Sequence, residues 1–457
     1  MTDLQDLNSQ IIDYGLFDKY FNDYFINNLI CPIYENDKYL KLAICNESNL
    51  QNIESRFSRK LKFQEFDKSD LQFVLSNIQI KKELIKYIGN SQTSIDSDNY
   101  TKLFFEKLIT FAVQNRASDI HIESNESKVL FRFRIDGALK SFFVLQKDYS
   151  KQISSYIKLI SNLDITQNRL PQDSRFKVKI NEKDYDFRVS ILPIIEGESI
   201  VIRVLDSNNS KKELKSLGFS DYILSNLYQA LKLKQGLILI AGPTGSGKTT
   251  TIYSLLQLLN SDKRKIITVE DPVEYKMNNI QQVAVNNKLG LTFSSVLKNI
   301  LRQDPDVLLI GEIREEESLK IALQASLTGH LVISTIHSNS ALQTISRLLD
   351  LNADRFLLST SLKYILSQRL VLSYCKSCKN KGCDKCNFTG FFDRLCIAEI
   401  IKVDENISSM ILKKDSLNEI KKHLLSKDFI DIFSDGINKV NENLTSKEEI
   451  LKVITNE

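Results

Sequence analysis

The stretch GLILIAGPTGSGKTTTIYSLLQLL, residues 236–259, decides the fold class of this chain. It opens with the apolar run Gly236–Ala241, which predicts a buried strand. The loop GPTGSGKT, Gly242–Thr249, follows, and the apolar pattern from Thr250 to Leu259 predicts a helix. A strand, a glycine-rich loop and a helix in this order form a phosphate-binding loop, or P-loop. The sequence therefore predicts an α/β P-loop domain that binds a nucleotide.

The residue types in this loop match the chemistry of a triphosphate. Glycines allow the backbone to curl so that its N–H groups face the phosphates. Lys248 can neutralise the β- and γ-phosphates, and the Thr249 hydroxyl can ligate Mg²⁺. We therefore expect ATP and Mg²⁺ as cofactors. The nucleotide-binding residues expected here are Gly242, Pro243, Thr244, Gly245, Ser246, Gly247, Lys248, Thr249 and Thr250.

Two acidic positions follow later apolar runs. Lys265–Val269 ends in Glu270, and Val307–Ile310 is followed by Gly311 and Glu312. Ligands of open α/β sheets bind beyond the carboxyl ends of the strands, so both acids are expected near the phosphates. A single acid there is as readily a solvated loop carboxylate or a helix cap. Two acids in the same topological position favour a catalytic role.

Two of the four histidines flank a third apolar run, Leu331–Thr335. A lone histidine is more often structural than catalytic. His337 ends its strand as the two acids do, which favours a phosphate-sensing role. For His330 a structural role is the better expectation.

Composition limits the remaining choices. At 457 residues, with 42% hydrophobic and 26% charged residues, the chain is expected to fold into two to four domains. The 61 basic and 57 acidic side chains give no global electrostatic reason for a nucleic-acid partner. No apolar run is long enough to span a bilayer, and the polar start MTDLQDLNSQ is not expected to act as a secretory signal. A cytoplasmic location is expected.

Changes of pattern along the chain predict three domains. Residues 1–90 form a small N-terminal domain, a candidate for partner docking, and the polar stretch Gly89–Asn99 has the composition of a linker. Residues 100–205 alternate as antiparallel strands do, with two helical patterns, which predicts an α+β domain. After a second polar break, residues 206–216, the range 217–457 predicts the P-loop domain with a helical C-terminus.

Five of the seven cysteines lie between Cys375 and Cys396. The pattern C-x₂-C-x₄-C-x₂-C holds two knuckles, each able to present two thiolates to a tetrahedral ion. Unmetallated thiols are the alternative, and Cys396 is expected to be a small buried hydrophobe. The sequence predicts a structural Zn²⁺ subdomain at residues 375–396 with the ligands Cys375, Cys378, Cys383 and Cys386.

Several motifs together resemble one family. They are ITVEDPVEY (267–275), LRQDPDVLLIGEIR (301–314), ASLTGHLVISTIH (325–337), ASDIHIE (117–123), FRFRIDG (131–137) and LPQD (170–173). The chain is similar over about residues 100–400 to the hexameric ATPases of type II secretion, type IV pilus assembly and related competence systems. This implies a RecA-like motor domain preceded by a PAS-like α+β domain. The N-terminal hundred residues match nothing in the family.

The resemblance also assigns roles to residues. The family's acidic box falls on Glu270, Asp271 and Glu274. Glu270 resembles the general base, and Asp271 and Glu274 are expected to be nucleotide-binding residues. Glu312 matches the acid that holds Mg²⁺, and His337 falls on the histidine box. Arg188, Arg203 and Arg314 match family arginines, the first two resembling arginine fingers of the smaller domain. Taken alone, Arg188 and Arg203 could be solvent-facing strand arginines.

The chain departs from the family in four places. Lys298 stands where the family usually has arginine, which loses the bidentate fork. Ser174 replaces a glycine, and Glu315 replaces an aspartate. The run after His337 reads SNSA in place of TNDA. None of these changes removes a core P-loop element.

The family implies a homohexamer that drives an inner-membrane platform protein, with a membrane-anchored adaptor as a further partner. It implies peripheral association with the inner face of the cytoplasmic membrane through partners, and no direct nucleic-acid contact. The pilus, secretion and DNA-uptake systems share this motor core and stay open at this point. A retraction motor, which typically lacks the cysteine cluster, a nucleic-acid translocase and a non-catalytic nucleotide-gated scaffold are the alternatives.

Overall fold

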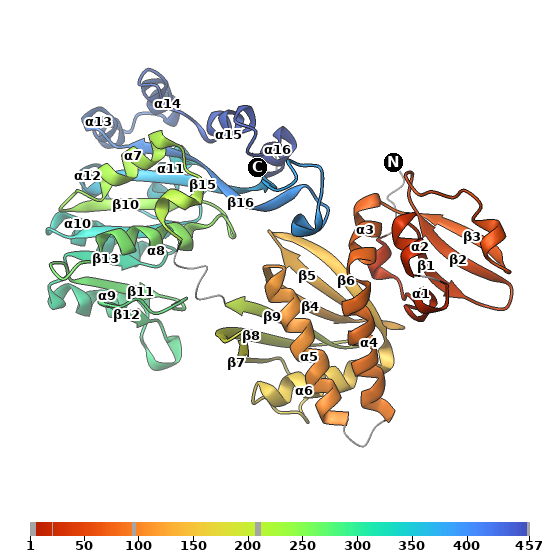
Figure 1. Ribbon diagram of the computed structural model, residues 1–457. Helices are drawn as coiled ribbons and strands as arrows, with labels where there is room; N and C mark the ends of the chain where they lie inside the picture. The colour runs from red at the N-terminus through yellow and green to blue at the C-terminus, as the bar shows by residue number, and fades with distance from the viewer. Residues whose placement is uncertain (1–5, 21, 94–96, 206–211, 455–457) are drawn as a thin grey trace. The chain divides into compact units, whose positions relative to one another are not determined.

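The computed structural model describes residues 6–20, 22–93, 97–205 and 212–454 (Figure 1). The chain forms two compact units. Unit 1 consists of Met1–Asp206 and Cys375–Phe392, and unit 2 of Ser207–Tyr374 and Asp393–Glu457. The division into three domains stays a prediction. By its contacts, the segment Cys375–Phe392 groups with unit 1 and not with the rest of residues 217–457.

A seven-stranded sheet forms the centre of unit 2, in the order β12-β11-β13-β14-β10-β15-β16. Neighbouring strands from β12 to β15 run parallel, which confirms the expected parallel α/β sheet. The carboxyl ends of β10, β11, β13 and β14 therefore meet at one edge. The strands are β10 (Gly236–Ala241), β11 (Ile266–Glu270), β12 (Ile280–Ala284), β13 (Val307–Ile310), β14 (Leu331–Ile336), β15 (Leu362–Tyr374) and β16 (Phe391–Lys402).

Helices cover both faces of this sheet (Figure 1). Alternate residues of a strand point to opposite faces. Ile238 and Ile240 pack against α7 and α8, whereas Leu237 and Leu239 join a core built with α9 to α14. The helices are α7 (Asp221–Ala230), α8 (Lys248–Leu259), α9 (Phe293–Ile300), α10 (Glu316–Leu327), α11 (Ala341–Asp350), α12 (Arg355–Ser361), α13 (Glu405–Lys413), α14 (Leu417–Leu425), α15 (Ile432–Asn441) and α16 (Lys447–Ile454).

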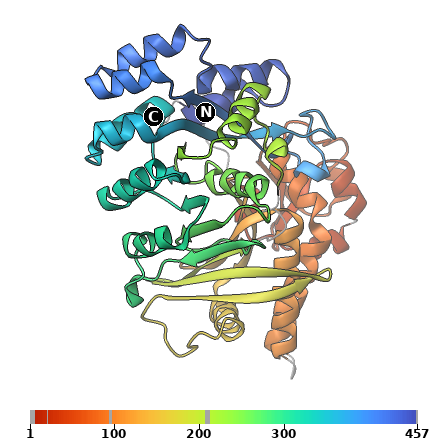
Figure 2. The ribbon, with the colours of Figure 1, turned by 90° about the vertical axis from the view of Figure 1, so that its left-hand side faces the viewer.

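Unit 1 contains an antiparallel sheet in the order β6-β5-β4-β9-β8-β7. Figure 2 shows its long β7–β8 pair in yellow. Side chains of α5 and α6 pack on one face, and rings such as Phe104 and Phe131 fill the core. This confirms the expected α+β fold. The elements are α5 (Ser97–Gln114), β4 (Ala117–Ser124), β5 (Lys128–Ile135), β6 (Ala138–Gln146), α6 (Ser150–Ile160), β7 (Gln172–Ile180), β8 (Lys183–Ile194) and β9 (Gly197–Leu205).

The N-terminal part of unit 1 has a core of its own, which runs from Leu7 to Ile78. A three-stranded sheet of order β1-β2-β3 lies within it. The elements are α1 (Gly15–Lys19), α2 (Asn22–Asn27), β1 (Cys31–Glu35), β2 (Tyr39–Ile44), β3 (Lys60–Glu65), α3 (Lys68–Ser76) and α4 (Ile78–Thr93).

The linker predicted at Gly89–Asn99 is wrong where the structure describes it. Residues 89–93 continue α4, α5 begins at Ser97, and residues 94–96 lie outside the described residues. Composition misled here because α4 buries only one stripe, with Leu84 and Ile88 in the core of the second sheet. The break predicted at residues 206–216 lies partly outside the described residues, and Leu214–Leu217 forms a short 3₁₀ turn. No helix within the described ranges is long and apolar enough to cross a membrane.

Candidate nucleotide site and cysteine cluster

The P-loop connects the fully buried strand β10 to α8. Gly242, Gly245 and Gly247 have positive φ values of 150°, 81° and 87°. A Cβ atom on Gly242 would lie 2.5 Å from the Ser246 Oγ and 2.7 Å from the Gln368 carbonyl oxygen. Glycine at 242 is therefore required by space as well as by conformation. In the first turn of α8, Thr249 is exposed and Thr250 is half-buried. Pro243 and Thr244 lie exposed on the loop itself.

The Lys248 ammonium lies against the loop. Its Nζ donates to the carbonyl oxygens of Gly242, at 2.6 Å, and Pro243, at 2.9 Å. The pKa of Lys248 is lowered to about 8, mainly by burial and also by the Arg369 charge, while the Glu312 carboxylate acts in the opposite direction. A phosphate bound beside this amine would stabilise its charged form and would therefore raise its pKa.

Glu270 ends β11 and is 4% exposed. The Tyr253 hydroxyl donates to its Oε2, and the Thr268 hydroxyl donates to its Oε1 at 2.6 Å. The Gln282 amide adds a longer contact of 3.3 Å to Oε1. Three donors from α8, β11 and β12 thus fix the orientation of this carboxylate. Asp271 and Glu274, the rest of the predicted acidic box, lie exposed on the following loop.

Glu312 and His337 come together as predicted, beyond the ends of β13 and β14. Glu312 pairs with Arg314 at 2.7 Å, and the His337 Nε2 lies 3.8 Å from its other carboxylate oxygen. Burial lowers the pKa of His337, the Lys248 and Arg314 charges lower it further, and Glu312 opposes them. Lys248, Glu312 and His337 therefore share one electrostatic neighbourhood at the carboxyl edge of the sheet.

His330 lies away from this edge. It precedes β14 at the amino end, roughly 20 Å along the strand from His337. Its Nδ1 lies 3.0 Å from the Ala325 carbonyl oxygen and 3.2 Å from the Thr328 hydroxyl. These contacts fit the structural role. Lys298, which replaces a family arginine, is exposed on α9 and pairs with Glu317 at 2.7 Å.

The two predicted finger arginines lie side by side on the antiparallel sheet of unit 1. Arg188 on β8 faces Arg203 on β9 in the pairing register, and both side chains are exposed. Arg203 Nε donates to the buried Asp119 carboxylate on β4 at 2.9 Å. Arg134 on β5 lies 3.8 Å from the other Asp119 oxygen. Asp119 is therefore close to two arginine side chains. The Arg203 side chain is the more exposed of the two, at 62% against 38% for Arg134.

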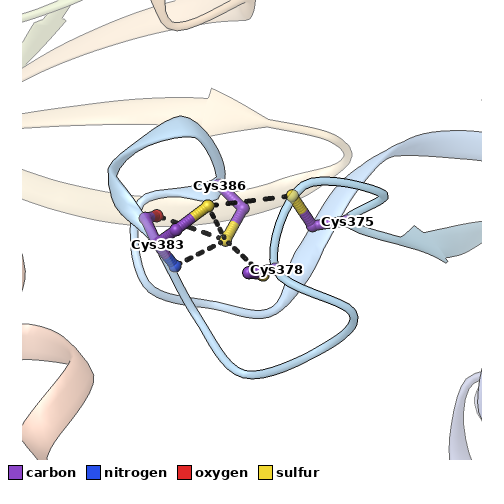
Figure 3. A group of neighbouring side chains, drawn as sticks. All are labelled: Cys375, Cys378, Cys383 and Cys386. Carbon is purple, nitrogen blue, oxygen red and sulfur yellow. Dashed lines mark hydrogen bonds between the residues drawn. The ribbon is translucent and has the colours of Figure 1, made fainter.

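The four predicted cysteine ligands converge (Figure 3). All four Sγ atoms lie within 4.8 Å of one another. The separations are 3.9 Å for Cys375–Cys383, and 3.8 Å for both Cys378–Cys386 and Cys383–Cys386. Thiolates at about 2.3 Å from a tetrahedral ion lie about 3.8 Å apart, so the cluster fits a metal of this geometry. Cys396 is buried elsewhere, in the core with α7 and α8.

The cysteine segment also contacts the α5–β4 turn within unit 1. The Asn387 amide donates to the Asn115 side chain at 3.1 Å. The Arg116 guanidinium carbon lies 3.5 Å from the centre of the Phe392 ring, a cation–π contact. Arg116 is held in turn by Asp136 at 2.8 Å. These contacts explain why the segment groups with unit 1.

Comparisons with known proteins show the family of this chain. Residues 94–452 match the family described as Type II/IV secretion system protein. The chain belongs to this family. Type II secretion system protein E of Pectobacterium carotovorum subsp. carotovorum is 40% identical over 399 residues, which cover 82% of this chain and 80% of that protein. Type II secretion system ATPase E of Vibrio cholerae serotype O1 is 40% identical over 367 residues, covering 75% and 73%.

Solved structures of the same architecture are also similar. The pilus retraction motor PilT with bound ADP has a TM-score of 0.56 and 27% identity, covering 76% of this chain and 96% of that one. The Legionella pneumophila ATPase DotB has a TM-score of 0.60 and 21% identity, covering 78% and 96%, and shows the fold alone.

Three residues that contact the candidate site were not predicted from the sequence: Tyr253, Gln368 and Arg369. Tyr253 belongs to an apolar helix pattern that reads as core. Gln368 and Arg369 interrupt the apolar strand LKYILSQRLVLSY, and that interruption was a signal. Gln368 contacts the P-loop, and the Arg369 Nη2 donates to the Asn339 carbonyl oxygen, two residues after His337, at 2.7 Å. Strand β15 therefore contacts both loops beside the candidate phosphate site.

Proposed function

We propose that this chain is a Mg²⁺-dependent ATPase motor of a type II secretion or related pilus-type system. The observation that carries the proposal is the meeting of Lys248, Glu312 and His337 beside a P-loop whose glycines adopt the conformations phosphate binding needs. A fold of this kind also serves other chemistry, so the argument rests on these side chains and not on the architecture.

The donors present suit Mg²⁺, which prefers hydroxyl, carboxylate and phosphate oxygens. The Thr249 hydroxyl and the Glu312 carboxylate would hold the ion, directly or through water. Bound there, it would neutralise charge on the β- and γ-phosphates. Lys248 supplies a second positive charge to the same oxygens.

Glu270 is the candidate general base. In hydrolysis, water oxygen forms a bond to the γ-phosphorus, the bond to the β–γ bridging oxygen breaks, and the water proton goes to the base. An ionised carboxylate offers about four lone-pair sites, so Glu270 can accept from water while Tyr253 and Thr268 hold it in place. His337 and Arg314, both beside Glu312, are candidates for sensing the γ-phosphate and for stabilising its charge.

Arg188 and Arg203 are the candidates for an arginine finger that completes the site when the protein assembles. The motor would act as a homohexamer at the cytoplasmic face of the inner membrane. It would drive a platform protein and be recruited through a membrane-anchored adaptor, with the region before residue 90 as the candidate docking part. The names of the relatives, type II secretion proteins, favour secretion among the filament systems.

The cysteine cluster would hold structural Zn²⁺. All four donors are thiolates, so no position stays open for a substrate, and a structural role fits better than a catalytic one. The cluster also favours an assembly or secretion motor over a retraction motor, since retraction motors of this family typically lack it.

The first test is ATP hydrolysis by the purified full-length protein, with its mass measured in solution. Wild type, Glu312→Gln and Arg203→Ala are compared with and without Mg²⁺. We expect Mg²⁺-dependent hydrolysis by a hexamer, and turnover reduced at least a hundredfold in both variants although each still binds ATP. Hydrolysis by a monomer, with Arg203→Ala fully active, would refute the ring mechanism and leave only a P-loop ATPase. Strong stimulation by single-stranded DNA would instead favour a translocase.

A further inference from the structure

Gln368 lies on β15, beside the P-loop strand β10, and its side chain is 1% exposed. Both ends of its amide are used. The Nε2 donates to the Ser246 carbonyl oxygen at 2.7 Å, and the Oε1 accepts from the Thr251 hydroxyl at 2.9 Å. One buried side chain therefore joins the centre of the P-loop to the second turn of α8.

The contact with Ser246 determines the orientation of one peptide group. A trans peptide is planar, so its C=O and N–H bonds point in opposite directions. The peptide that carries the Ser246 carbonyl also carries the Gly247 N–H. When Gln368 draws that carbonyl toward β15, the Gly247 N–H must point away from β15. In a P-loop, backbone N–H groups of the loop surround the phosphate oxygens, and an N–H that points away from β15 is available for this role.

Two glycines of the loop, Gly242 and Gly247, lie close to Gln368. A Cβ atom on Gly247 would lie 3.2 Å from the Gln368 Nε2, and one on Gly242 would lie 2.7 Å from the Gln368 backbone oxygen. The loop backbone thus lies so close to β15 that a side chain at either position would be crowded against Gln368. The glycines of the motif GPTGSGKT therefore allow the close contact between the loop and Gln368.

We infer that Gln368 is a positioning residue for nucleotide binding, which orients the Gly247 N–H toward the phosphates by holding the Ser246 carbonyl. This inference rests on the proposed ATP site. The bond that Gln368 accepts from Thr251 serves only to hold the amide and α8 together. The two hydrogen bonds of one side chain thus have different consequences, which makes the inference testable.

Two substitutions separate the bonds. Gln368→Met keeps the size of the side chain and removes both bonds, whereas Thr251→Val removes only the bond to Thr251. Each leaves a buried polar group without its partner, so each lowers the melting temperature of the nucleotide-free protein by a few degrees. We expect ADP affinity to fall about tenfold in Gln368→Met, and to stay within about twofold of wild type in Thr251→Val.

The kinetic signature follows from the same geometry. A backbone N–H binds the phosphates in the ground state and in the transition state alike, so its misplacement raises the KM for ATP more than it lowers kcat. We expect an about tenfold higher KM with kcat reduced less than threefold in Gln368→Met. A residue with a purely structural role would lower the melting temperature without this split.

The measurement is calorimetric titration of the full-length protein with Mg-ADP, beside a thermal melt without nucleotide. ADP affinity within twofold of wild type in a folded Gln368→Met protein would overturn the inference. An equal loss in Thr251→Val would also overturn it, because the effect would then follow stability. If Gln368→Met does not fold, Gln368→Glu replaces it. This variant keeps the acceptor for Thr251 and lacks the donor for Ser246. An unchanged ADP affinity in Gln368→Glu would overturn the inference. Failure of the wild type to bind ADP would refute the proposed function instead.

Discussion

Tyr253 donates its phenolic hydrogen to the carboxylate of Glu270, and it does so from the helix that begins with Lys248. One helix therefore supplies the cation expected to bind the phosphates and orients the candidate base. Burial raises the pKa of the Tyr253 hydroxyl well above its ordinary value, and the bond to Glu270 raises it further. The phenol thus stays protonated, and remains a donor, throughout the range in which a cell works.

Removing this donor should slow hydrolysis. Tyr253→Phe keeps the ring, whose centre lies 4.3 Å from that of Tyr275, and removes only the hydroxyl. The Glu270 carboxylate then keeps Thr268 as its close donor and is held less firmly. We expect kcat to fall about tenfold, because a less firmly oriented base raises the activation free energy of the chemical step by about 1.4 kcal/mol. ATP affinity should stay within about twofold of wild type, measured by equilibrium titration beside steady-state turnover.

The matched control is Tyr364→Phe, which removes a hydroxyl from a buried tyrosine on β15. We expect it to leave kcat within twofold. A Tyr253→Phe enzyme with wild-type turnover would show that Glu270 does not depend on this bond. It would also weaken the assignment of Glu270 as the base.

Nucleotide binding should depend on pH through Lys248. Its pKa of about 8 in the free protein lies below the ordinary value of 10.5. Above pH 8 the free protein therefore holds this amine mostly neutral, and a bound phosphate must restore its proton. We expect ATP affinity to be nearly constant from pH 7 to 7.5 and to fall by up to about tenfold per pH unit above pH 8, with proton uptake on binding. Calorimetry in two buffers of different ionisation enthalpy measures both.

The control for this profile is Lys248→Arg, since a guanidinium stays protonated throughout the range. Its absolute affinity will differ from wild type, so the comparison concerns the slope between pH 8 and 9.5. We expect the slope to vanish in the arginine variant. The same slope in both proteins would assign the titration to a group other than Lys248.

The sequence was sufficient for features that are local in the chain. The strand, loop and helix around Gly242–Thr249 and the two cysteine knuckles depend on spacing, and spacing is visible in a sequence. The placement of Glu312 and His337 followed from one rule about parallel sheets. Composition failed at Gly89–Asn99, because polar residues on the outside of a helix look like those of a linker.

The supporting contacts could not be predicted, because they join distant parts of the chain. Arg203 and Asp119 are 84 residues apart, and Gln368 and Thr251 are 117 apart. Each pair depends on a strand order and register that only the folded sheet reveals. Tyr253 was hidden for another reason. A tyrosine within an apolar helix indicates burial and says nothing of what its hydroxyl contacts.

The bond between Asp119 and Arg203 offers a test of the arginine finger. Asp119→Asn keeps the size of the side chain and removes the charge that holds Arg203 and Arg134. Arg203 is mostly exposed, so we expect a loss of stability of only about 1 kcal/mol. Turnover should fall about fivefold, because the guanidinium is no longer fixed in one direction. Urea unfolding and steady-state ATPase measurements give the two numbers.

A control on the same sheet is Asp186→Asn, whose carboxylate lies 3.5 Å from the Lys177 ammonium at the surface. This variant should match wild type in turnover and in stability. Equal turnover in wild type and Asp119→Asn would indicate that Arg203 acts without this partner. A fivefold loss in both variants would point to a general effect of charge on the sheet.

The cysteine cluster should hold one Zn²⁺ per chain, and the metal should stabilise the fold. Cys378→Ser removes one of four thiolates from a site whose sulfur spacing fits a tetrahedral ion, so we expect metal content after dialysis to fall below about 0.1 per chain. The melting temperature should fall by about 5 °C. Cys396→Ala, outside the cluster, should keep its metal. Elemental analysis of both proteins measures the metal content. A wild-type protein that contains no metal and melts at the same temperature as chelator-treated protein would show that the fold does not depend on zinc at these thiols.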